Sequence, residues 1–446
     1  MSFYSPVITN AKDVAAGDKL HLFRYVEDPD QVKVERYEEH GGYRAWRKVL
    51  SGMEPAAVIE QVKGSGLRGR GGAGFPTGMK WGFIPKDSPK PRYLCCNADE
   101  SEPGTCKDRV LMERDPHGII EGMAIASYAI GCHQMFIYIR GEFAHCADVM
   151  EKAMEEAYRR GHLGKNIYGS GYDLDMVVHT GGGAYICGEE TALLNSLEGE
   201  RGMSRIRPPF PAIAGLYACP TIVNNVESLA SVPHIINNGA AWYRTMGTEK
   251  SPGSKIFSLS GHVNRPGNYE VELSFPLRDL IYDEKYGGGI LGGKKLKGVI
   301  PGGSSTPFLT PDVIDSVNLD YESLTEHGSM LGSGAVIVFH EDTCIVWVIK
   351  KLIHFYRHES CGKCTPCREG TGWLEQIISR IEAGQGQPGD IEKIEDICTN
   401  IMGRTVCPLG DAAVMPIQSA IKHWRDEWAY HIESRKCLVK SRYDFK

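Results

Sequence analysis

The stretch Cys361-Gly-Lys-Cys364-Thr-Pro-Cys367 places three cysteines within seven residues, in a C-x2-C-x2-C pattern. A fourth cysteine, Cys407, lies 40 residues after Cys367 and is followed by a proline. A [4Fe–4S] cluster needs four thiolate ligands, and a tight run of three cysteines with a remote Cys-Pro is a known way to supply them. The sequence therefore predicts an iron–sulfur site with Cys361, Cys364, Cys367 and Cys407 as its ligands.

Two alternatives compete with this ligand set. Zinc usually binds cysteines as two C-x2-C pairs, so a group of three with one distant cysteine is the less usual zinc pattern. Cys398 competes with Cys407 as the fourth ligand, but it shares an apolar helical stripe with Ile391, Ile394 and Ile401. A thiol on such a stripe is more often a small buried core residue. The pattern therefore favours the cluster over zinc, and Cys407 over Cys398.

Length and composition limit the class of protein. The 446 residues are enough for about three domains, and 42% hydrophobic with 24% charged residues is usual for a soluble globular chain. A net charge of −6 gives no electrostatic support for nucleic-acid binding. No apolar run approaches the ~18 residues of a membrane span, and the N-terminus lacks the pattern of a secretory signal. The other cysteines are scattered, which favours a reducing compartment.

Strand and helix patterns alternate between residues 93 and 197. We expect strands at 93–98, 135–140 and 175–179, with helices at 116–131 and 144–160 between them. Such alternation is typical of a mostly parallel sheet covered by helices. The sequence therefore predicts an α/β domain.

A first glycine-rich loop occupies residues 67–81. It contains a formal G-x-G-x-x-G at Gly69, Gly71 and Gly74, but that fingerprint needs a strand before it and a helix after it. Here a helix at 54–62 precedes the loop, and Pro76 and Gly78 disfavour the formation of a helix after it. The interpretation that survives is a flexible loop that carries the cations Arg68, Arg70 and Lys80 and that could hold a phosphate or a flat cofactor. The alternative is a merely mobile loop.

A second glycine-rich segment, Thr180-Gly-Gly-Gly183, follows an expected strand and precedes a helix that runs to Leu197. A helix start presents free N–H groups to a phosphate, whereas Glu189 and Glu190 nearby would favour ribose hydroxyls. The acidic run 99–104 follows another expected strand, at the position where α/β sheets bind ligands. The alternative is that this run is a solvated turn. Asn224 and Asn225 suit the edge of a flavin ring, or cap a helix that begins near Val226. Two glycine-rich loops are consistent with two nucleotide-like cofactors.

The rest of the chain divides into two parts. Residues 250–335 read as a small α+β domain with a hairpin formed by 255–260 and 269–273, and further strands are expected at 296–300 and 335–340. From Cys344 onward the pattern is helical, and we expect helices at 345–358, 372–383, 391–402 and 411–430 before a basic tail.

Five residue strings closely resemble one family, the NADH-binding, flavin-carrying F-type (51-kDa-type) subunit of respiratory complex I, the NADH:quinone oxidoreductase. The strings are residues 67–81, Asn97-Ala-Asp-Glu-Ser-Glu-Pro-Gly-Thr105, Tyr185-Ile-Cys-Gly-Glu-Glu-Thr-Ala192, Asn224-Asn-Val-Glu227 and Glu359-Ser-Cys-Gly-Lys-Cys-Thr-Pro-Cys-Arg-Glu-Gly370. The likeness extends over residues 40–440. It implies a Rossmann-like FMN/NADH domain with a lead-in at 1–249, a ubiquitin-like (SLBB-type) α+β domain at 250–335 and a helical [4Fe–4S] domain at 336–446.

The resemblance also implies a set of cofactor-binding positions. These are Gly69, Arg70, Gly71, Gly72, Gly74, Phe75, Lys80, Phe83, Asn97, Asp99, Glu100, Glu102, Tyr185, Gly188, Glu189, Glu190, Arg207, Phe210, Asn224 and Asn225. Phe75, Phe83, Glu102, Tyr185 and Phe210 would form the NADH side, and Arg207 would contact the dinucleotide. The residues that would line the FMN are Gly69, Arg70, Gly71, Lys80, Asn97, Asp99, Gly188, Glu189, Glu190, Asn224 and Asn225. Arg207 stands where many relatives have lysine. The positive charge is kept, but the planar, forked guanidinium of arginine replaces the single ammonium donor of lysine.

The activity that the resemblance implies is oxidation of NADH to NAD+ on FMN, with single electrons passed to the [4Fe–4S] cluster and on toward quinone. FMN fits between a hydride donor and a one-electron acceptor because it handles both kinds of transfer. No residue acts as a general base, and Lys80 and Glu102 would assist. The carboxylates of Glu102 and Glu190 would disfavour the additional phosphate of NADPH.

The implied partners are a thioredoxin-like [2Fe–2S] subunit and a large iron–sulfur subunit, at the cytoplasmic face of a bacterial inner membrane or in the mitochondrial matrix. The alternative is the diaphorase subunit of an NAD-linked hydrogenase or formate dehydrogenase. Such chains often carry further iron–sulfur segments, which are not found here, and that favours complex I. A third hypothesis, from a different class, is a zinc- or ligand-binding scaffold without redox activity.

Overall fold

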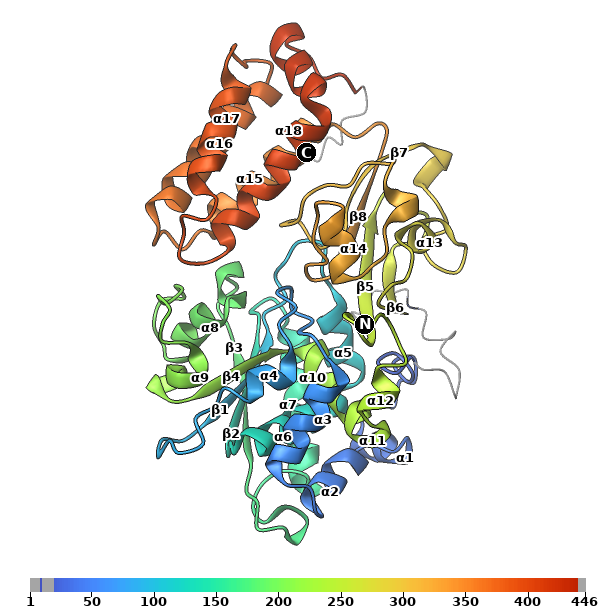
Figure 1. The fold of residues 1–446 in the computed structure, drawn as a ribbon, viewed down its shortest axis with the longest axis vertical. Coiled ribbons are helices and arrows are strands. Elements are labelled where there is room, and N and C mark those ends of the chain that lie inside the picture. Colours follow the sequence, from blue (N-terminus) through green and yellow to red (C-terminus); the bar gives the residue numbers. More distant parts are fainter. Residues whose placement is uncertain (1–8, 10–19, 440–446) are drawn as a thin grey trace.

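The computed structural model describes Thr9 and residues 20–439, which fold into three packed units (Figure 1). An α/β unit lies at the bottom of Figure 1, a helical unit at the top, and a smaller α+β unit beside and between them. None of the described helices combines the length and the apolar composition that a membrane-spanning helix needs. The three-part fold class expected from the sequence is confirmed.

The α/β unit is built on a four-stranded, fully parallel sheet in the order β3-β2-β1-β4. The strands are β1 (Tyr93–Ala98), β2 (Gln134–Ile139), β3 (Asp175–Thr180) and β4 (Thr221–Asn225). The chain steps outward from β1 to β3 and then returns to place β4 on the opposite side of β1. The topological switch point therefore lies between β1 and β4, and open α/β sheets bind ligands outside the carboxyl ends of the strands at such a point.

Helices cover this sheet. α6 (Pro116–Ile130) packs against β1 and β2, and α7 (Ala144–Arg159) packs against β3. α6 is buried along nearly its whole length because α2, α3, α7, α10 and α11 also pack against it, which explains its apolar composition on every side. The other helices are α1 (Val34–Glu39), α2 (Arg44–Leu50), α3 (Pro55–Ser65), α4 (Thr77–Trp81), α5 (Lys107–Arg114), α8 (Glu190–Leu197), α9 (Pro211–Ala214), α10 (Val226–Ala230), α11 (Val232–Asn238) and α12 (Ala240–Tyr243).

The middle unit holds a second four-stranded sheet, in the order β6-β5-β8-β7. Its elements are β5 (Ser254–Gly261), β6 (Gly267–Glu272), α13 (Leu277–Tyr282), β7 (Leu296–Ile300), α14 (Tyr321–Glu326) and β8 (Ala335–His340). β5 and β6 form the expected antiparallel hairpin, while β5 and β8 run parallel. Because β8 belongs to this sheet, the unit continues past the boundary that we expect at residue 335.

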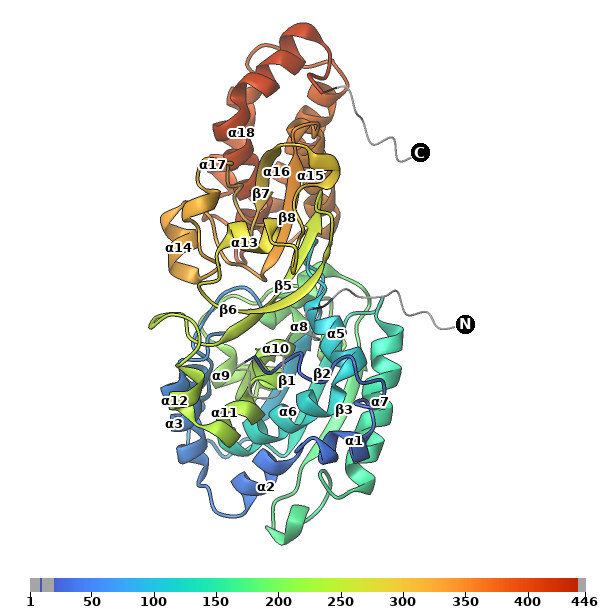
Figure 2. The ribbon, with the colours of Figure 1, turned by 90° about the vertical axis from the view of Figure 1, so that its right-hand side faces the viewer.

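The C-terminal unit consists of α15 (Ile345–Glu359), α16 (Thr365–Glu382), α17 (Asp390–Ile401) and α18 (Leu409–Ser434), which pack against one another. On α17 the expected stripe of Ile391, Ile394, Cys398 and Ile401 is buried. Cys398 is therefore a core residue, as predicted. Figure 2 shows the helical unit at the opposite end of the molecule from the α/β unit, and α18 also contacts the middle unit, since its Glu427 Oε2 lies 2.6 Å from Lys297 Nζ of β7.

Some elements differ from the expectation. A short helix, α4, does follow the first glycine loop, because Pro76 occupies its N-cap, where proline is tolerated, instead of its interior. The sequence patterns do not predict β4 and α5. A Pro- and Asn-rich segment hides β4, and α5 is rich in charged residues, several of which are buried. α16 begins inside the cysteine motif, at Thr365 and not at Gly372, and α18 continues through residues expected in the tail. Residues 440–446 of that tail lie outside the described residues.

Candidate cofactor site and cysteine cluster

The carboxyl edge of the parallel sheet brings together side chains that are more than a hundred residues apart in sequence. In the register of β1 with β4, Asn97 lies opposite Asn225 and Cys96 lies opposite Asn224. The Asn97 amide Nδ2 donates to the carbonyl oxygen of Gly188 at 2.9 Å. The 185–190 segment therefore lies across the end of β1, at the topological switch point, while the triple glycine lies against the end of β2, where Gly181 N donates to Ile139 O at 2.8 Å.

The two asparagines at the end of β4 have structural partners. Trp81 Nε1 donates to Asn224 Oδ1 at 2.8 Å, which ties α4 to the sheet. Asn225 Oδ1 accepts from Glu227 N at 3.0 Å and caps α10, while its Nδ2 donates to Asp108 Oδ2 at 2.6 Å. The helix-cap interpretation of Asn225 is thus the one that the structure supports.

The first glycine loop is closed at its base and lies against the end of β4. Gly69 N donates to Phe75 O at 2.8 Å, so residues 69–75 form a compact loop. A Cβ on Gly71 would approach the Asn225 Cβ to 3.1 Å, and Gly72 has φ +135° with open space around it. A side chain at either position would fill or distort this region, because Gly72 adopts a conformation that favours glycine.

Arg70 does not face the candidate cofactor site, contrary to the expectation that it lines the FMN. Its side chain is fully buried, and Nη2 donates to Tyr243 Oη at 3.0 Å and to the carbonyl oxygens of Pro252 and Ser254 at 3.1 and 3.0 Å. Its backbone N–H donates to Ser228 Oγ at 2.8 Å. The side chain therefore anchors the loop to the α/β unit and to the start of β5.

Arg68 is likewise used within the protein. Its Nη1 lies 2.7 Å from Glu322 Oε1, and its guanidinium lies 3.7 Å from the ring centroid of Tyr321 on α14. A Cβ on Gly74, which has φ +65°, would come within 2.4 Å of the same tyrosine ring. The middle unit therefore clamps the loop, and among Arg68, Arg70 and Lys80 it is Lys80 that can contribute charge to the site.

The acidic run after β1 contains two buried carboxyl groups with different roles. Asp99 Oδ1 accepts from Ser101 Oγ at 2.6 Å, whereas Oδ2 is buried with no hydrogen-bond partner among the described residues, and burial raises the pKa of Asp99 to about 7. Glu100 accepts from the backbone N–H groups of Asp108 and Arg109 at 2.8 and 3.0 Å, and burial raises its pKa to about 7 as well. Glu100 therefore caps α5 and does not face the site as expected, while Asp99 keeps one oxygen free.

Glu189 also corrects an expectation. Its Oε2 accepts from the backbone N–H groups of Thr191 and Ala192, both at 3.0 Å, so that it caps α8. The free N–H groups that we expect to meet a phosphate at this helix start are thus already paired with a carboxylate.

Glu190 is balanced by two cations. Its Oε2 lies 2.7 Å from Lys80 Nζ, and its Oε1 lies 3.0 Å from Arg207 Nη1. Lys80 also donates to the carbonyl oxygen of Val223 in β4 at 2.8 Å. This chain of contacts links α4, α8 and β4, and it compensates most of the negative charge of Glu190.

Three phenylalanines expected on the NADH side are exposed. Phe75, Phe83 and Phe210 have exposed fractions of 45%, 52% and 56%, and the rings of Phe75 and Phe83 lie 5.9 Å apart on either side of α4. The Arg207 guanidinium lies 6.0 Å from the Phe210 ring centroid. Large apolar side chains left in solvent beside a charged chain of contacts suit stacking of a planar ligand.

Tyr185 joins all three units. Its hydroxyl donates to Glu102 Oε2 at 2.7 Å, and Glu102 Oε1 accepts from Ser305 N at 2.8 Å and from Ser304 Oγ at 3.2 Å in the middle unit. The Tyr185 backbone N–H donates to Glu359 Oε2 at 3.0 Å, at the end of α15. The partners that the structure describes for Glu102 are all neutral, in contrast with those of Glu190.

The four predicted cluster ligands gather in one place. Cys367 is buried, and the partly buried Cys361, Cys364 and Cys407 pack against the same apolar core. Burial raises the pKa of Cys367 to about 11, and the nearby thiols of Cys407, Cys361 and Cys364 add to the rise. The backbone N–H of Val406 donates to Cys364 Sγ at 3.3 Å, a contact of the kind that tunes cluster sulfurs.

The cysteine site lies directly against residues 185–190 and 201–204, which follow the second glycine-rich segment. Besides the bond from Tyr185 to Glu359, Lys363 Nζ donates to the Ser204 carbonyl oxygen at 2.6 Å, and Arg201 Nη2 donates to the Cys361 carbonyl oxygen at 3.2 Å. Residues 186–194 and helices α15–α18 also share one hydrophobic core. The two sites that the sequence predicts separately are thus adjacent.

Sequence reasoning missed a buried ion cluster beneath the first glycine loop. Glu227 lies 2.8 Å from Lys107 Nζ and 3.1 Å from Lys255 Nζ, and all three side chains are 0–1% exposed. Burial alone would raise the pKa of Glu227, but the two lysines hold it at about 2, while burial lowers the pKa of Lys255 to about 7. Glu227 belongs to the string Asn224-Asn-Val-Glu and lies in the first turn of the otherwise apolar helix α10. A carboxylate in such a helix was the sequence signal that could have indicated a buried ion pair.

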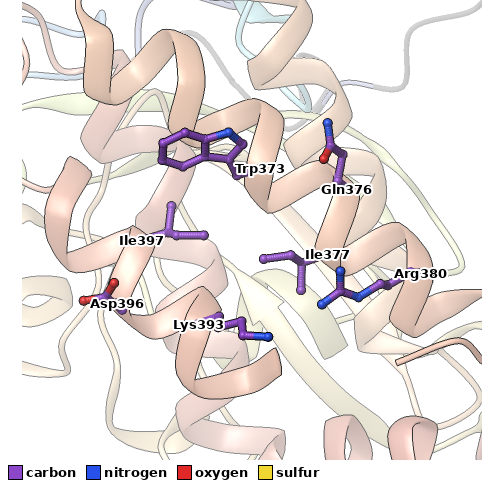
Figure 3. Close-up of a pocket in the computed structure, with 7 residues that line it drawn as sticks. All are labelled: Trp373, Gln376, Ile377, Arg380, Lys393, Asp396 and Ile397. Carbon is purple, nitrogen blue, oxygen red and sulfur yellow. The ribbon is translucent and has the colours of Figure 1, made fainter. Parts of the chain in front are cut away.

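A separate surface hollow lies between α16 and α17. Figure 3 shows its lining residues Trp373, Gln376, Ile377, Arg380, Lys393, Asp396 and Ile397. None of the predicted cofactor or cluster residues lines it, so it is distinct from the site at the carboxyl edge of the sheet.

The residues present fit the cofactors that the sequence implies. The unpaired buried oxygen of Asp99, the open region at Gly72 and the exposed phenylalanine rings suit a flavin and a dinucleotide. Four converging thiols in an apolar setting suit an iron–sulfur cluster. The side chains of Arg70, Glu100 and Glu189 do not take part in this fit, since each is engaged in holding the fold together.

Comparison with known families agrees with these units. Residues 62–234 match the Nuo51 FMN-binding domain, residues 255–338 an SLBB domain, and residues 347–431 the NADH-ubiquinone oxidoreductase-F iron-sulfur binding region. The fold and the site thus define a flavin- and iron–sulfur-containing oxidoreductase.

Similar full-length proteins narrow this class. The chain is 54% identical over 416 residues to the second F-type NADH-quinone oxidoreductase subunit of Rhizobium meliloti (strain 1021), with 93% of this chain and 98% of the relative covered. It is 55% identical over 423 residues to the F-type NADH-quinone oxidoreductase subunit of Mycobacterium tuberculosis (strain ATCC 25618 / H37Rv), with 93% and 94% covered. The chain belongs to the family of F-type subunits of NADH-quinone oxidoreductase.

Solved structures of a hydrogenase share the fold. A chain of an NAD+-reducing [NiFe]-hydrogenase in the H2-reduced state is 35% identical with a TM-score of 0.78, and the match covers 89% of this chain and 65% of that one. The air-oxidized state gives 33% identity and a TM-score of 0.79, with 99% and 70% covered. This chain therefore spans about two thirds of the length of those hydrogenase chains.

Proposed function

We propose that this chain is the NADH-oxidising subunit of a respiratory NADH-quinone oxidoreductase. When bound, FMN accepts two electrons as hydride from NADH and releases them singly, and a [4Fe–4S] cluster takes up one electron at a time. The observation that carries the proposal is the contact of the 185–190 segment with both the carboxyl edge of the sheet and the cysteine unit. That contact supports a flavin-type site beside an iron–sulfur-type site.

The residues of this chain would contribute binding and orientation. Backbone N–H groups of residues 71–75 together with Asn97 and Asp99 would hold the flavin at the switch point, and Phe75, Phe83 and Phe210 would stack against the dinucleotide. Lys80, held by Glu190 and Val223, would supply positive charge where negative charge develops. Cys361, Cys364, Cys367 and Cys407 would hold the cluster.

Cofactor preference would rest on Glu102 more than on Glu190. The resemblance implies that both disfavour the additional phosphate of NADPH, but Glu190 is paired with two cations. Glu102 has neutral partners, so that its charge is left to act on a second anion.

We further infer that the chain assembles with a thioredoxin-like [2Fe–2S] subunit and a large iron–sulfur subunit, at the cytoplasmic face of a bacterial inner membrane. The relatives' names, which describe one subunit of a complex, support this inference. Contact with the membrane would be made through the complex and not by this chain.

A diaphorase subunit of an NAD-linked hydrogenase is the second candidate. The structural likeness to the NAD+-reducing hydrogenase favours it, but the sequence identity there is 35% against 54% for the quinone oxidoreductase relative. Affinity purification of the tagged chain from its own cells separates the two: quinone-reductase subunits support the first function and hydrogenase subunits the second.

The chemistry is tested on the purified full chain by absorbance and EPR spectra before and after addition of NADH. Flavin absorbance that bleaches with NADH, together with the EPR signal of a reduced iron–sulfur cluster, is expected. A protein that contains zinc, no flavin and no iron would instead support the non-redox scaffold and refute the proposal.

A further inference from the structure

A second group of metal-binding side chains lies at the other end of α15. Cys344, His431 and Cys437 each offer one ligand atom, and these atoms all lie within 4.8 Å of one another. Cys344 precedes α15, His431 lies in the last turns of α18, and Cys437 follows that helix. The 15 residues of α15 separate this group from the cluster cysteines by about 22 Å at 1.5 Å per residue. The two groups are therefore independent.

The geometry of the group matches a single tetrahedral ion. Cys344 Sγ lies 3.4 Å from His431 Nε2. With Zn–S of about 2.3 Å and Zn–N of about 2.0 Å, tetrahedral angles place a sulfur and a nitrogen ligand about 3.5 Å apart. The observed separation therefore needs almost no adjustment for the two atoms to share one ion.

His431 is oriented as a ligand. Its Nδ1–H donates to the Glu427 carbonyl oxygen at 2.8 Å, which fixes the tautomer and leaves the lone pair of Nε2 directed at Cys344. A metal-bound histidine almost always makes such a bond through its other ring nitrogen. The His431 side chain is buried, whereas Cys437 is partly exposed, so that the group is open on the Cys437 side.

The backbone returns Cys437 to the group. Arg435 has φ 54°, a left-handed conformation that ends α18 and reverses the chain. Cys437 thereby comes back to the start of α15, where the Cys344 sulfur also accepts from Trp347 N at 3.4 Å. Glu427, one turn before His431, accepts from Ile345 N and from Lys297 Nζ of β7 at 2.8 and 2.6 Å. The group thus sits where the middle unit, α15 and the C-terminal segment meet.

We propose that Cys344, His431 and Cys437 bind Zn²⁺ through three protein ligands, with water in the fourth position, and that the ion fastens the C-terminal segment to the start of α15. Two thiolates and one neutral imidazole are a ligand set that Zn²⁺ prefers. Binding releases the two thiol protons, so that the site carries no net charge when it is filled. A disulfide between Cys344 and Cys437 would not account for the alignment of His431 Nε2 with the Cys344 sulfur, whereas a shared metal ion accounts for all three side chains.

The test uses the full chain with its flavin and iron, incubated with Zn²⁺ and then desalted. We expect about one zinc per chain at unchanged iron content, and X-ray absorption at the zinc edge with two sulfurs at about 2.3 Å and two lighter ligands, one nitrogen and one oxygen, at about 2.0–2.2 Å. Zinc lodged in the cluster site would show sulfur ligands alone, and that result would overturn the proposal.

Two variants and two matched controls complete the experiment. C437S and H431Q should lower zinc affinity in chelator competition at least tenfold, whereas C106S (an exposed cysteine) and H423Q (a histidine on the outer side of the same helix) should retain it. Flavin and iron contents report folding of each variant. Zinc that stays bound in C437S and H431Q, a wild-type chain that binds no zinc, or a Cys344–Cys437 disulfide found by mass spectrometry would each refute the site.

Discussion

Replacement of Glu227 by glutamine removes the carboxylate that pairs with two buried lysines beneath the first glycine loop. In the wild type Glu227 lies 2.8 Å from Lys107 Nζ and 3.1 Å from Lys255 Nζ. Lys107 would keep a second carboxylate, that of Asp108 at 2.7 Å. Lys255 would keep only the Arg70 carbonyl oxygen at 3.4 Å among its described hydrogen-bond partners, so its ammonium would be left without a countercharge.

The expected cost follows from this uncompensated charge. Removal of one partner of a buried ion pair destabilises a protein by about 3–5 kcal/mol. A domain of about 150–250 residues, the size class of the α/β unit, loses about 2–4 °C of melting temperature per kcal/mol of lost stability. E227Q should therefore melt roughly 6–20 °C below the wild type. The first glycine loop should also become less ordered, because Lys255 Nζ donates to the carbonyl oxygen of Arg70 in that loop.

The assay is thermal unfolding of the full chain at pH 6, below the pKa of about 7 of Lys255, so that the wild-type lysine carries its charge. Unfolding is followed by circular dichroism, with flavin content after gel filtration as a second measurement. K255M is the matched variant and should cost less, since burial already lowers the pKa of Lys255 to about 7. Stability should rise in the wild type from pH 7 to 9, because the unfolded lysine holds a proton that the folded one has lost, and K255M should flatten that rise.

The double variant decides the reasoning. If the charges act as one network, E227Q with K255M should recover a large part of the loss, because no lysine is then left unpaired. A melting temperature for E227Q within 2 °C of the wild type would refute the argument, where ~2 °C marks an effect below ~1 kcal/mol. Strictly additive effects of the two changes would do the same.

Three further predictions concern the site. E102Q should raise the ratio of NADPH to NADH oxidation roughly tenfold (about 1.4 kcal/mol) and E190Q much less, as measured by kcat/KM, because Glu190 is neutralised by Lys80 and Arg207; equal ratios for E102Q and wild type would contradict this. C407S should lose most of its iron while C398S keeps it, as measured by iron analysis, since Cys398 on α17 is buried in the hydrophobic core. The reverse result would make Cys398 the fourth cluster ligand and Cys407 a structural residue. Because the folded pKa of Asp99 is about 7 and the ordinary value 3.8, its contribution to stability is complete below the ordinary value and is lost as pH rises through 7. Apo D99N should therefore lose about 2–3 kcal/mol less than apo wild type between pH 5 and pH 8 in denaturant unfolding, and an unchanged pH profile would show that Asp99 is ionised throughout.

Local sequence was a good guide to regular elements with strong periodicity. β1, β7 and β8 have the residues expected of them, and α6 and α7 end within a residue of the expected limits. Boundaries failed where the signal was not periodic. Pro76 and Gly78 argue against a helix that nevertheless forms, and the Pro- and Asn-rich stretch before Val226 conceals the edge strand β4.

The candidate site could be predicted in its membership more than in its roles. The family strings identify Asn97, Tyr185 and the four cysteines, and in the structure Asn97 lies against Gly188 while Tyr185 and the cysteines pack against one apolar core. Arg70, Glu100 and Glu189, which the resemblance places at the cofactor, instead bind the fold's own backbone and hydroxyl groups. A charged residue in a motif can face a ligand or a helix end, and motif spacing does not distinguish these outcomes.

By itself, the sequence determined the kinds of element and the cofactor chemistry, because periodicity and cysteine spacing are local properties of the chain. Only the tertiary structure decided that the chain returns after β3 to place β4 beside β1, which creates the switch point. It also decided that the 185–190 segment touches both this edge and the cysteine unit, and that Cys344 meets His431 and Cys437. These are contacts between residues far apart in sequence, and packing of whole units, which no local pattern encodes, brings them together.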